Sequence, residues 1–250
     1  MPPLLTAEQL AGVFAKLERA DENIHNLNTE VVAFLKECPD GGFGEDKQQA
    51  AREFAKFHAG RPIPLGFGVL AGEIVHHLRS ALDHIVWLLS TESYRSADER
   101  EIGFPILTVR PLTRDKRSVY DRKVAGIASA DALRLIEQVQ PYNAPNPLDN
   151  PLAIIHDLDR IDKHQTIALV VTSWDLSITV PFSAMTGGEV IGGPHMSYED
   201  FAARPTENLK LEFTAQIAFA SLGQRMRQNV TPALTHLSNA ARDVVRLFGS

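Results

Sequence analysis

The sequence contains a single cysteine, Cys38, and no long run of apolar residues. One cysteine cannot form an internal disulfide framework, nor a metal site built from several thiolates of one chain. The first residues, MPPLLTAEQ, show no basic segment followed by an apolar run, and no stretch approaches the roughly 18 apolar residues of a membrane span. We therefore expect a cytoplasmic protein that does not bind a membrane.

The sequence also lacks an excess of basic residues and the common catalytic motifs. Its 25 Lys and Arg against 31 Asp and Glu give a formal charge of −6, which argues against a protein that coats nucleic acid by charge alone. Neither G-x-S-x-G nor G-x4-G-K occurs, so serine-hydrolase and P-loop mechanisms have no support. With 250 residues, 44% of them hydrophobic, the chain has the length and composition of one globular domain.

A strong helical pattern runs from Gly66 to Glu92. At about 100° per residue, its aliphatic side chains fall on one side, so we expect one long buried helix. The opposite side carries Glu73, His76, His77, Ser80, Asp83, His84 and Trp87, with Arg79 at its edge. This polar side is either a functional site or a solvated face.

Other segments show helical patterns or turn signals. From Thr6 to Cys38, apolar residues repeat every three or four positions, which predicts a long helix that Thr6 caps and that packs against another helix of the chain or a second copy. Further helices are expected at Phe43–His58, Ser129–Gln140, Pro151–Gln165 and Pro232–Phe248, the last capped by Thr231. Ser93–Arg100 and the basic run Arg110–Lys123 are expected to be solvated loops, the run alternatively a phosphate-facing patch.

The period of the apolar residues changes from 3.6 to 2 after Gln165. Ile167–Thr172, Leu176–Phe182 and Leu209–Phe219 predict an antiparallel sheet of three or four strands. We therefore predict a single α+β domain over residues 1–250. It would consist of a bundle of four or five helices, from residues 6–165 and 231–248, with a small antiparallel sheet from residues 167–220 in the C-terminal half.

Asp162 falls on the inner face of the helix expected at Pro151–Gln165. The apolar residues of that face are Ile154, Ile155, Leu158 and Ile161. A carboxylate that points into a core needs a partner there or loses its charge. We therefore expect Asp162 within ion-pair reach of Arg79 or a histidine of the central helix. His164 lies on a different side of the same helix.

Arg79 and His84 stand in the sequence RSALDH, an arginine followed after four residues by a histidine. This spacing resembles the R-x4-6-H signature of the HEPN superfamily, helical-bundle proteins that include metal-independent endoribonucleases and non-catalytic members. The resemblance implies that Arg79 steadies a phosphate and that His84 acts as general acid or base, in a cleft shared by two protomers and without a cofactor or metal. Supporting roles would fall to His77, Asp83, Asp162 and His164.

A second resemblance covers more of the chain. GEIVHHLRSALDHIVWLL and the later LDRIDKHQ are similar to an uncharacterised bacterial family with an LRSALDH helix and an IDKH helix, which implies no activity. Three functions therefore stay open. The chain is an RNA-cleaving or RNA-binding homodimer, a non-catalytic interaction or dimerisation module with a buried His/Asp/Arg network, or a metal-binding bundle. The candidate metal ligands are Glu73, His76, His77, Asp83, His84, Asp157, Asp162 and His164.

Overall fold

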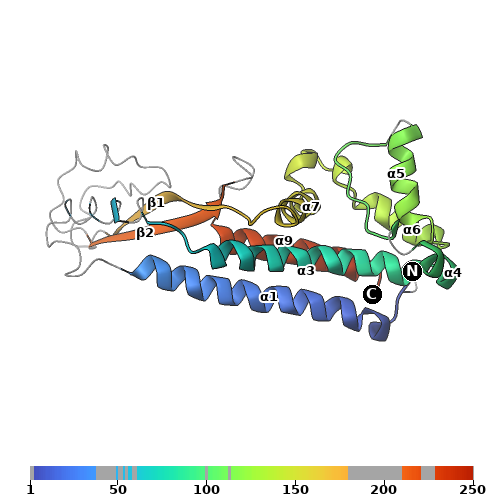
Figure 1. The fold of residues 1–250 in the computed structure, drawn as a ribbon, viewed down its shortest axis with the longest axis horizontal. Coiled ribbons are helices and arrows are strands. Elements are labelled where there is room, and N and C mark those ends of the chain that lie inside the picture. Colours follow the sequence, from blue (N-terminus) through green and yellow to red (C-terminus); the bar gives the residue numbers. More distant parts are fainter. Residues whose placement is uncertain are drawn as a thin grey trace, which may run out of the picture.

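The computed structural model describes residues 3–37, 61–98, 101–111, 114–179, 210–220 and 229–249, together with positions 49, 53, 56 and 57. Seven α-helices and a two-stranded antiparallel sheet lie within these residues. The long helices α1, α3 and α9 lie side by side, with the sheet beyond one end and the short helices α4, α5 and α6 at the other (Figure 1). The predicted class, a mainly helical α+β protein with a small antiparallel sheet in its C-terminal half, is confirmed.

Helix α1 (Ala7–Lys36) packs antiparallel to helix α3 (Leu65–Leu89). It begins where predicted, because the Thr6 hydroxyl accepts a hydrogen bond from the Gln9 amide while the Gln9 side chain accepts one from the Thr6 amide. Cys38, the last predicted position of its apolar seam, lies outside the described residues. The seam is buried at every position that the structure describes: Leu10, Val13, Leu17, Ala20, Ile24, Leu27, Val31 and Phe34. The seam is therefore covered within the chain by α3 and α9, and a second copy is not needed to bury it.

Helix α3 ends at Leu89, before the predicted end at Glu92. Ser90 is extended and turns its hydroxyl back to the Val86 carbonyl, at 2.8 Å, so the helix stops there. A new helix, α4 (Glu92–Asp98), follows where a loop was expected, and that prediction was wrong. Glu92 in its first turn and Arg95 in its last suit the helix dipole, and Arg95 also stacks on Trp87, 4.3 Å from the ring centre.

The prediction that the basic run Arg110–Lys123 forms a solvated loop was also wrong, because the run contains most of helix α5 (Arg114–Val124). Tyr120 and Val124, four residues apart, are buried on one face of this helix. Two apolar residues at helical spacing are enough to anchor it, although most of its residues are charged or polar.

The remaining helices follow the predicted caps with one exception. Helices α6 (Ala130–Gln138) and α7 (Pro151–Asp162) begin after Ser129 and Asn150, whose side chains accept hydrogen bonds from Ala132 and Leu152. The short 3₁₀ turns η2 (Pro141–Asn143) and η3 (Pro147–Asp149) connect them. Helix α9 (Val230–Arg246) starts earlier than predicted, so Thr231 lies inside it and is not the cap.

The end of α9 returns to the start of α1. The amides of Leu4 and Leu5 both donate to the carbonyl of Phe248, at 3.0 and 2.9 Å, and the Phe248 ring is fully buried. The two ends of the chain therefore lie together at one end of the bundle (Figure 1).

The sheet consists of β1 (Leu169–Thr179) and β2 (Lys210–Phe219), paired antiparallel so that Leu169 faces Phe219. β1 joins two segments that were predicted as separate strands. The register shifts between Val171 and Ser173, and this bulge interrupts the apolar alternation that a single strand would show. Residues 180–209, where additional strands were predicted, lie outside the described residues, as does the helix predicted at Phe43–His58 apart from four positions. None of the described helices is long and apolar enough to cross a membrane.

Candidate functional site

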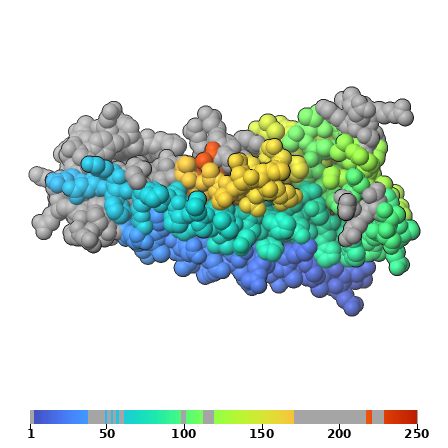
Figure 2. Space-filling view, viewed as in Figure 1, coloured from blue at the N-terminus to red at the C-terminus, as the bar shows by residue number. Residues whose placement is uncertain are grey.

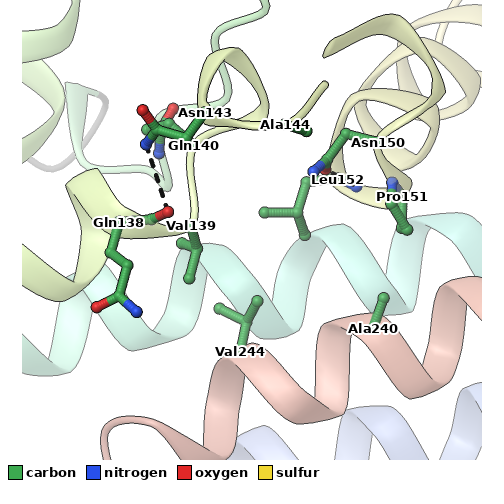
Figure 3. A pocket seen from close by; sticks show the side chains of 10 residues that line it. All are labelled: Gln138, Val139, Gln140, Asn143, Ala144, Asn150, Pro151, Leu152, Ala240 and Val244. Atoms are coloured by element: carbon green, nitrogen blue, oxygen red, sulfur yellow. Dashed lines mark hydrogen bonds between the residues drawn. The ribbon is translucent and has the colours of Figure 1, made fainter. Parts of the chain in front are cut away.

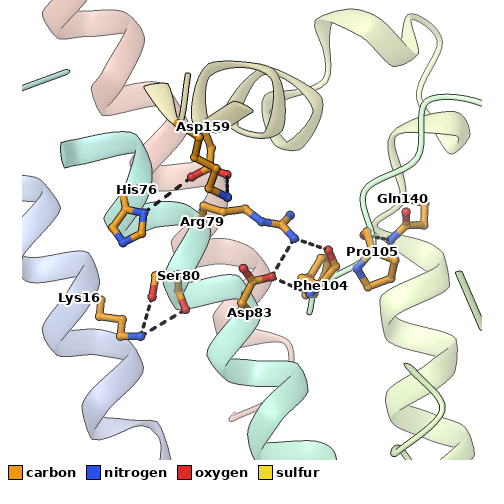
Figure 4. Close-up of polar contacts among 10 residues, drawn as sticks. Lys16, His76, Arg79, Ser80, Asp83, Phe104, Pro105, Gln140 and Asp159 are labelled. Atoms are coloured by element: carbon orange, nitrogen blue, oxygen red, sulfur yellow. Dashed lines mark hydrogen bonds and ion pairs between the residues drawn. The ribbon is translucent and has the colours of Figure 1, made fainter. Parts of the chain in front are cut away.

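Arg79 and Asp83, one turn apart on α3, together bind the backbone of Phe104 (Figure 4). Arg79 Nη2 donates to the Phe104 carbonyl and pairs with Asp83 Oδ1, both at 2.8 Å, while Asp83 Oδ1 accepts the Phe104 amide at 2.7 Å. The Phe104 ring is fully buried, and Arg79 is only 7% exposed. Arg79 was expected at the edge of the polar side, but it lies in the interior as part of what we call the Arg79 network, formed by Arg79, Asp83 and Phe104.

Gln140 extends the same arrangement toward α6. Its side chain is 1% exposed and donates to the carbonyls of Pro105, at 2.8 Å, and Ile136, at 3.0 Å, while it accepts the Leu107 amide at 3.1 Å. The backbone of residues 104–107 has no sheet partner in the described chain, so these side chains satisfy polar groups that would otherwise be buried unpaired. Their role here is structural.

A cavity of about 320 Å³ beside Gln140, between α6, α7 and α9, does not add a site (Figure 3). The Asn143 side-chain amide donates to the Glu137 carbonyl at 2.7 Å, and the Asn150 oxygen caps α7. None of the side-chain nitrogen or oxygen atoms described around this cavity is buried without a partner, so no such group points to a ligand.

His84 lies on a different side of α3, against α1. Its ring is half-buried and edge-on to Trp87, 5.9 Å between centroids, and a Cβ at Gly12 would lie 3.1 Å from its Cε1. Its Nδ1 is buried and has no hydrogen-bond partner among the described residues. Burial, and secondarily the charge of Lys16, lower the pKa of His84, so the imidazole is neutral at pH 7.

The structure does not bring Arg79 and His84 together within one chain. Five residues at about 100° each separate their directions by roughly 140° around the helix axis. Arg79 faces the Phe104 segment, whereas His84 faces α1. The cation near His84 is instead Lys16, whose Nζ donates to the Ser80 hydroxyl at 2.7 Å.

The carboxylate of α7 that is buried against α3 is Asp159, not Asp162. Asp159 is 3% exposed, its Oδ1 lies 3.8 Å from His76 Nδ1, and its Oδ2 pairs with Lys163 Nζ at 2.6 Å. Asp162, the last residue of α7, is half-buried and makes no ion pair or hydrogen bond with the described residues, so that expectation was wrong. The sequence does carry the signal, because Leu152, Ile155 and Asp159 are spaced by three and four.

Asp162 nevertheless lies directly over α3. Its Oδ1 is so close to Gly72 that a Cβ there would be 1.9 Å away, so glycine is what allows the end of α7 to approach. Burial, and secondarily the neighbouring charge of Asp159, raise the pKa of Asp162, while His76 opposes that rise.

The remaining predicted residues are scattered. His77 is half-buried, and burial followed by the charge of His76 lowers its pKa. His164 is exposed and lies beyond the end of α7. Within the part of the chain that the structure describes, no group of three or more His, Cys, Asp or Glu side chains is placed to hold a metal ion, so the metal-binding alternative has no geometric support there.

The exposed side of α3 forms a surface between α1 and α7, seen as a band between them in Figure 2. Besides Leu65, 80% exposed at the first residue of α3, two apolar side chains reach this surface, Val69 at 48% and Trp87 at 38% exposure, among the polar residues Glu73, His76 and Ser80. We call Val69, Glu73, His76, Ser80 and Trp87 the α3 surface. No family model, curated protein or solved structure matches this chain.

Proposed function

We propose that this chain is a non-catalytic helical interaction module that acts as a homodimer. The observation that supports it is the burial of Arg79. Its guanidinium is bound to Asp83 and to the Phe104 carbonyl. Turning it toward a phosphate would leave a carboxylate and a buried carbonyl without a partner, which is costly. The arginine that the R-x4-H resemblance assigns to phosphate therefore serves the fold.

The α3 surface is the proposed dimer contact. The apolar seam of α1 is already covered inside the chain, so it is not available for a second copy. Trp87 is the largest exposed apolar side chain on α3, and it stays 38% exposed although Arg95 of α4 stacks on its ring. Tryptophan in such a position is the residue type most often found as an interface anchor.

Sedimentation of the purified protein is expected to show a dimer that the Trp87→Lys variant weakens by at least about tenfold, because the substitution removes the anchor and adds like charges across a two-fold axis. Leu247→Lys is the matched control, since Leu247 is 40% exposed at the end of α9, and it should leave the dimer unchanged. A parent protein that stays monomeric at every concentration contradicts the dimer.

The second candidate function is that of a HEPN-like, metal-independent endoribonuclease or RNA-binding protein. The observation that favours it is His84, a half-buried imidazole whose lowered pKa keeps it neutral at pH 7 and whose Nδ1 is unused among the described residues. Such a group can take up a proton from an attacking hydroxyl. In this form of the hypothesis, Lys16 rather than Arg79 would face the phosphate.

A cleavage assay on single-stranded RNA in EDTA separates the two functions. The interaction module predicts no cleavage. The nuclease predicts cleavage that persists in EDTA and falls at least about 100-fold in His84→Ala. His236→Ala is the control, because His236 is exposed on α9, and it should behave as the parent. Cleavage that the His84 substitution abolishes would overturn the non-catalytic proposal.

A further inference from the structure

A pocket of about 350 Å³ lies away from the α3 surface, where α7 meets α5, η3 and the extended segment of residues 106–111. Residues of all four elements line the pocket, and these elements come from separate segments of the chain. Its volume is at the lower end of the roughly 300–1,000 Å³ of ligand pockets, so it fits one small molecule.

Exposed aliphatic side chains converge on this pocket. Val109, Val119 and Leu148 line it and are 59%, 42% and 51% exposed. They make up a third of the nine large apolar side chains that are exposed in the described part of the chain. A single exposed aliphatic residue needs no explanation, but three around one concavity are typical of a surface that a ligand covers.

The polar residues that line the pocket are His156 and Asp157, adjacent on α7, and Thr108 of the extended segment. The Asp157 carboxylate lies 3.8 Å from the guanidinium of Arg160, which is mostly exposed. His156 lies at the exposed rim of the pocket, where partial burial of its ring, and secondarily the charge of Arg79, lower its pKa, so the ring is neutral at pH 7. A neutral imidazole offers one hydrogen-bond donor and one acceptor.

No cation of the neighbouring wall is turned toward this pocket among the described side chains. Arg110, next to Val109, donates instead to Asn143 Oδ1 at 2.9 Å and lies over the Tyr142 ring, 5.2 Å from its centre. An anionic head group would meet the Asp157 carboxylate. An ammonium head group would have to compete with Arg160.

We propose that this pocket binds a small uncharged amphipathic molecule. Its compact apolar body, a ring or a branched chain, would contact Val109, Val119 and Leu148, and its hydroxyl group would hydrogen-bond to the His156 ring. This inference does not depend on the proposed function, because the pocket uses neither the α3 surface nor His84.

The test is a titration of the full chain, followed by NMR of its valine and leucine methyl groups, with three probes that share one ring. Cyclohexylmethanol is expected to bind with a dissociation constant of about 1 mM or tighter and to shift the methyl signals of Val109, Val119 and Leu148. Cyclohexylmethylamine and cyclohexanecarboxylate should bind at least about tenfold more weakly. Equal binding of either charged probe would overturn the assignment of an uncharged ligand, and absence of binding by the alcohol would overturn the site.

Matched variants distinguish the apolar wall from the polar end. Leu148→Asp should weaken the binding of cyclohexylmethanol at least about tenfold. Leu247→Asp, which introduces the same charge at a comparably exposed position, should leave this binding unchanged. His156→Ala should weaken the binding of cyclohexylmethanol about fivefold, whereas His236→Ala should leave it unchanged. All four positions are exposed, so the variants should keep the fold, which circular dichroism verifies. Unchanged affinity in His156→Ala would show that the head group does not bind there.

Discussion

Replacing Arg79 by alanine is expected to lower the free energy of unfolding by about 2 to 3 kcal/mol, because it removes a buried charged donor from the Phe104 carbonyl and the ion-pair partner of the half-buried Asp83. The substitution removes the hydrogen bond that Arg79 donates to the Phe104 carbonyl and the ion pair between Arg79 and Asp83. It also releases the segment that carries the buried Phe104 ring. Chemical denaturation of the two proteins, monitored by circular dichroism, measures the difference.

The control for this prediction is Arg246→Ala. Arg246 also pairs with a carboxylate on its own helix, Asp243 at 3.3 Å, but both side chains are more than half exposed. An exposed pair of this kind contributes at most about 1 kcal/mol. If the two variants lose similar stability, Arg79 does not stabilise the fold and its burial no longer argues against phosphate binding.

Adding a single methyl group at Gly68 is expected to destabilise the protein by about 2 to 3 kcal/mol. A Cβ at this position would lie 2.3 Å from the Ile167 carbonyl oxygen, which belongs to the backbone and cannot rotate away. Gly68 is thus the point where the chain leading from α7 to β1 crosses α3. Thermal unfolding of Gly68→Ala measures the cost.

Gly66 supplies the comparison within the same helix. A Cβ there has no neighbour within 4 Å, so Gly66→Ala should be neutral or gain up to about 1 kcal/mol from the higher helix propensity of alanine. Equal effects of the two substitutions would mean that the crossing at Ile167 does not decide the effect.

The long helices could be predicted because their determinants are local. The seam of α1 repeats over many turns, and Thr6, Ser129 and Asn150 each cap the helix that follows them in the sequence. Helix α5 could not be predicted in this way, because its composition is dominated by charge and only Tyr120 and Val124 mark its buried face. Its stability comes from packing that the sequence does not display.

The candidate site was predicted less well, because it depends on contacts between distant residues. A helical wheel places Arg79 at the edge of the polar side, but it cannot show that Phe104, 25 residues later, covers the guanidinium. The wheel for α7 correctly indicated a carboxylate facing α3. It selected Asp162 over Asp159 because it did not take into account that the helix ends at Asp162. The R-x4-H match likewise fixes a spacing along one helix and carries no information about burial.

The order in which α1 meets its neighbours has a consequence for synthesis of the chain. α3 follows α1 closely enough for the two to form a helical hairpin early, but α9 is made after the other described helices. Until then, the side of α1 that α9 covers remains uncovered on the nascent chain. The bonds from Leu4 and Leu5 to Phe248 can form only after α9 has left the ribosome. Helix α1 is therefore fully enclosed only after α9 has been made, and until then its aliphatic seam is the stretch that a chaperone would need to shield.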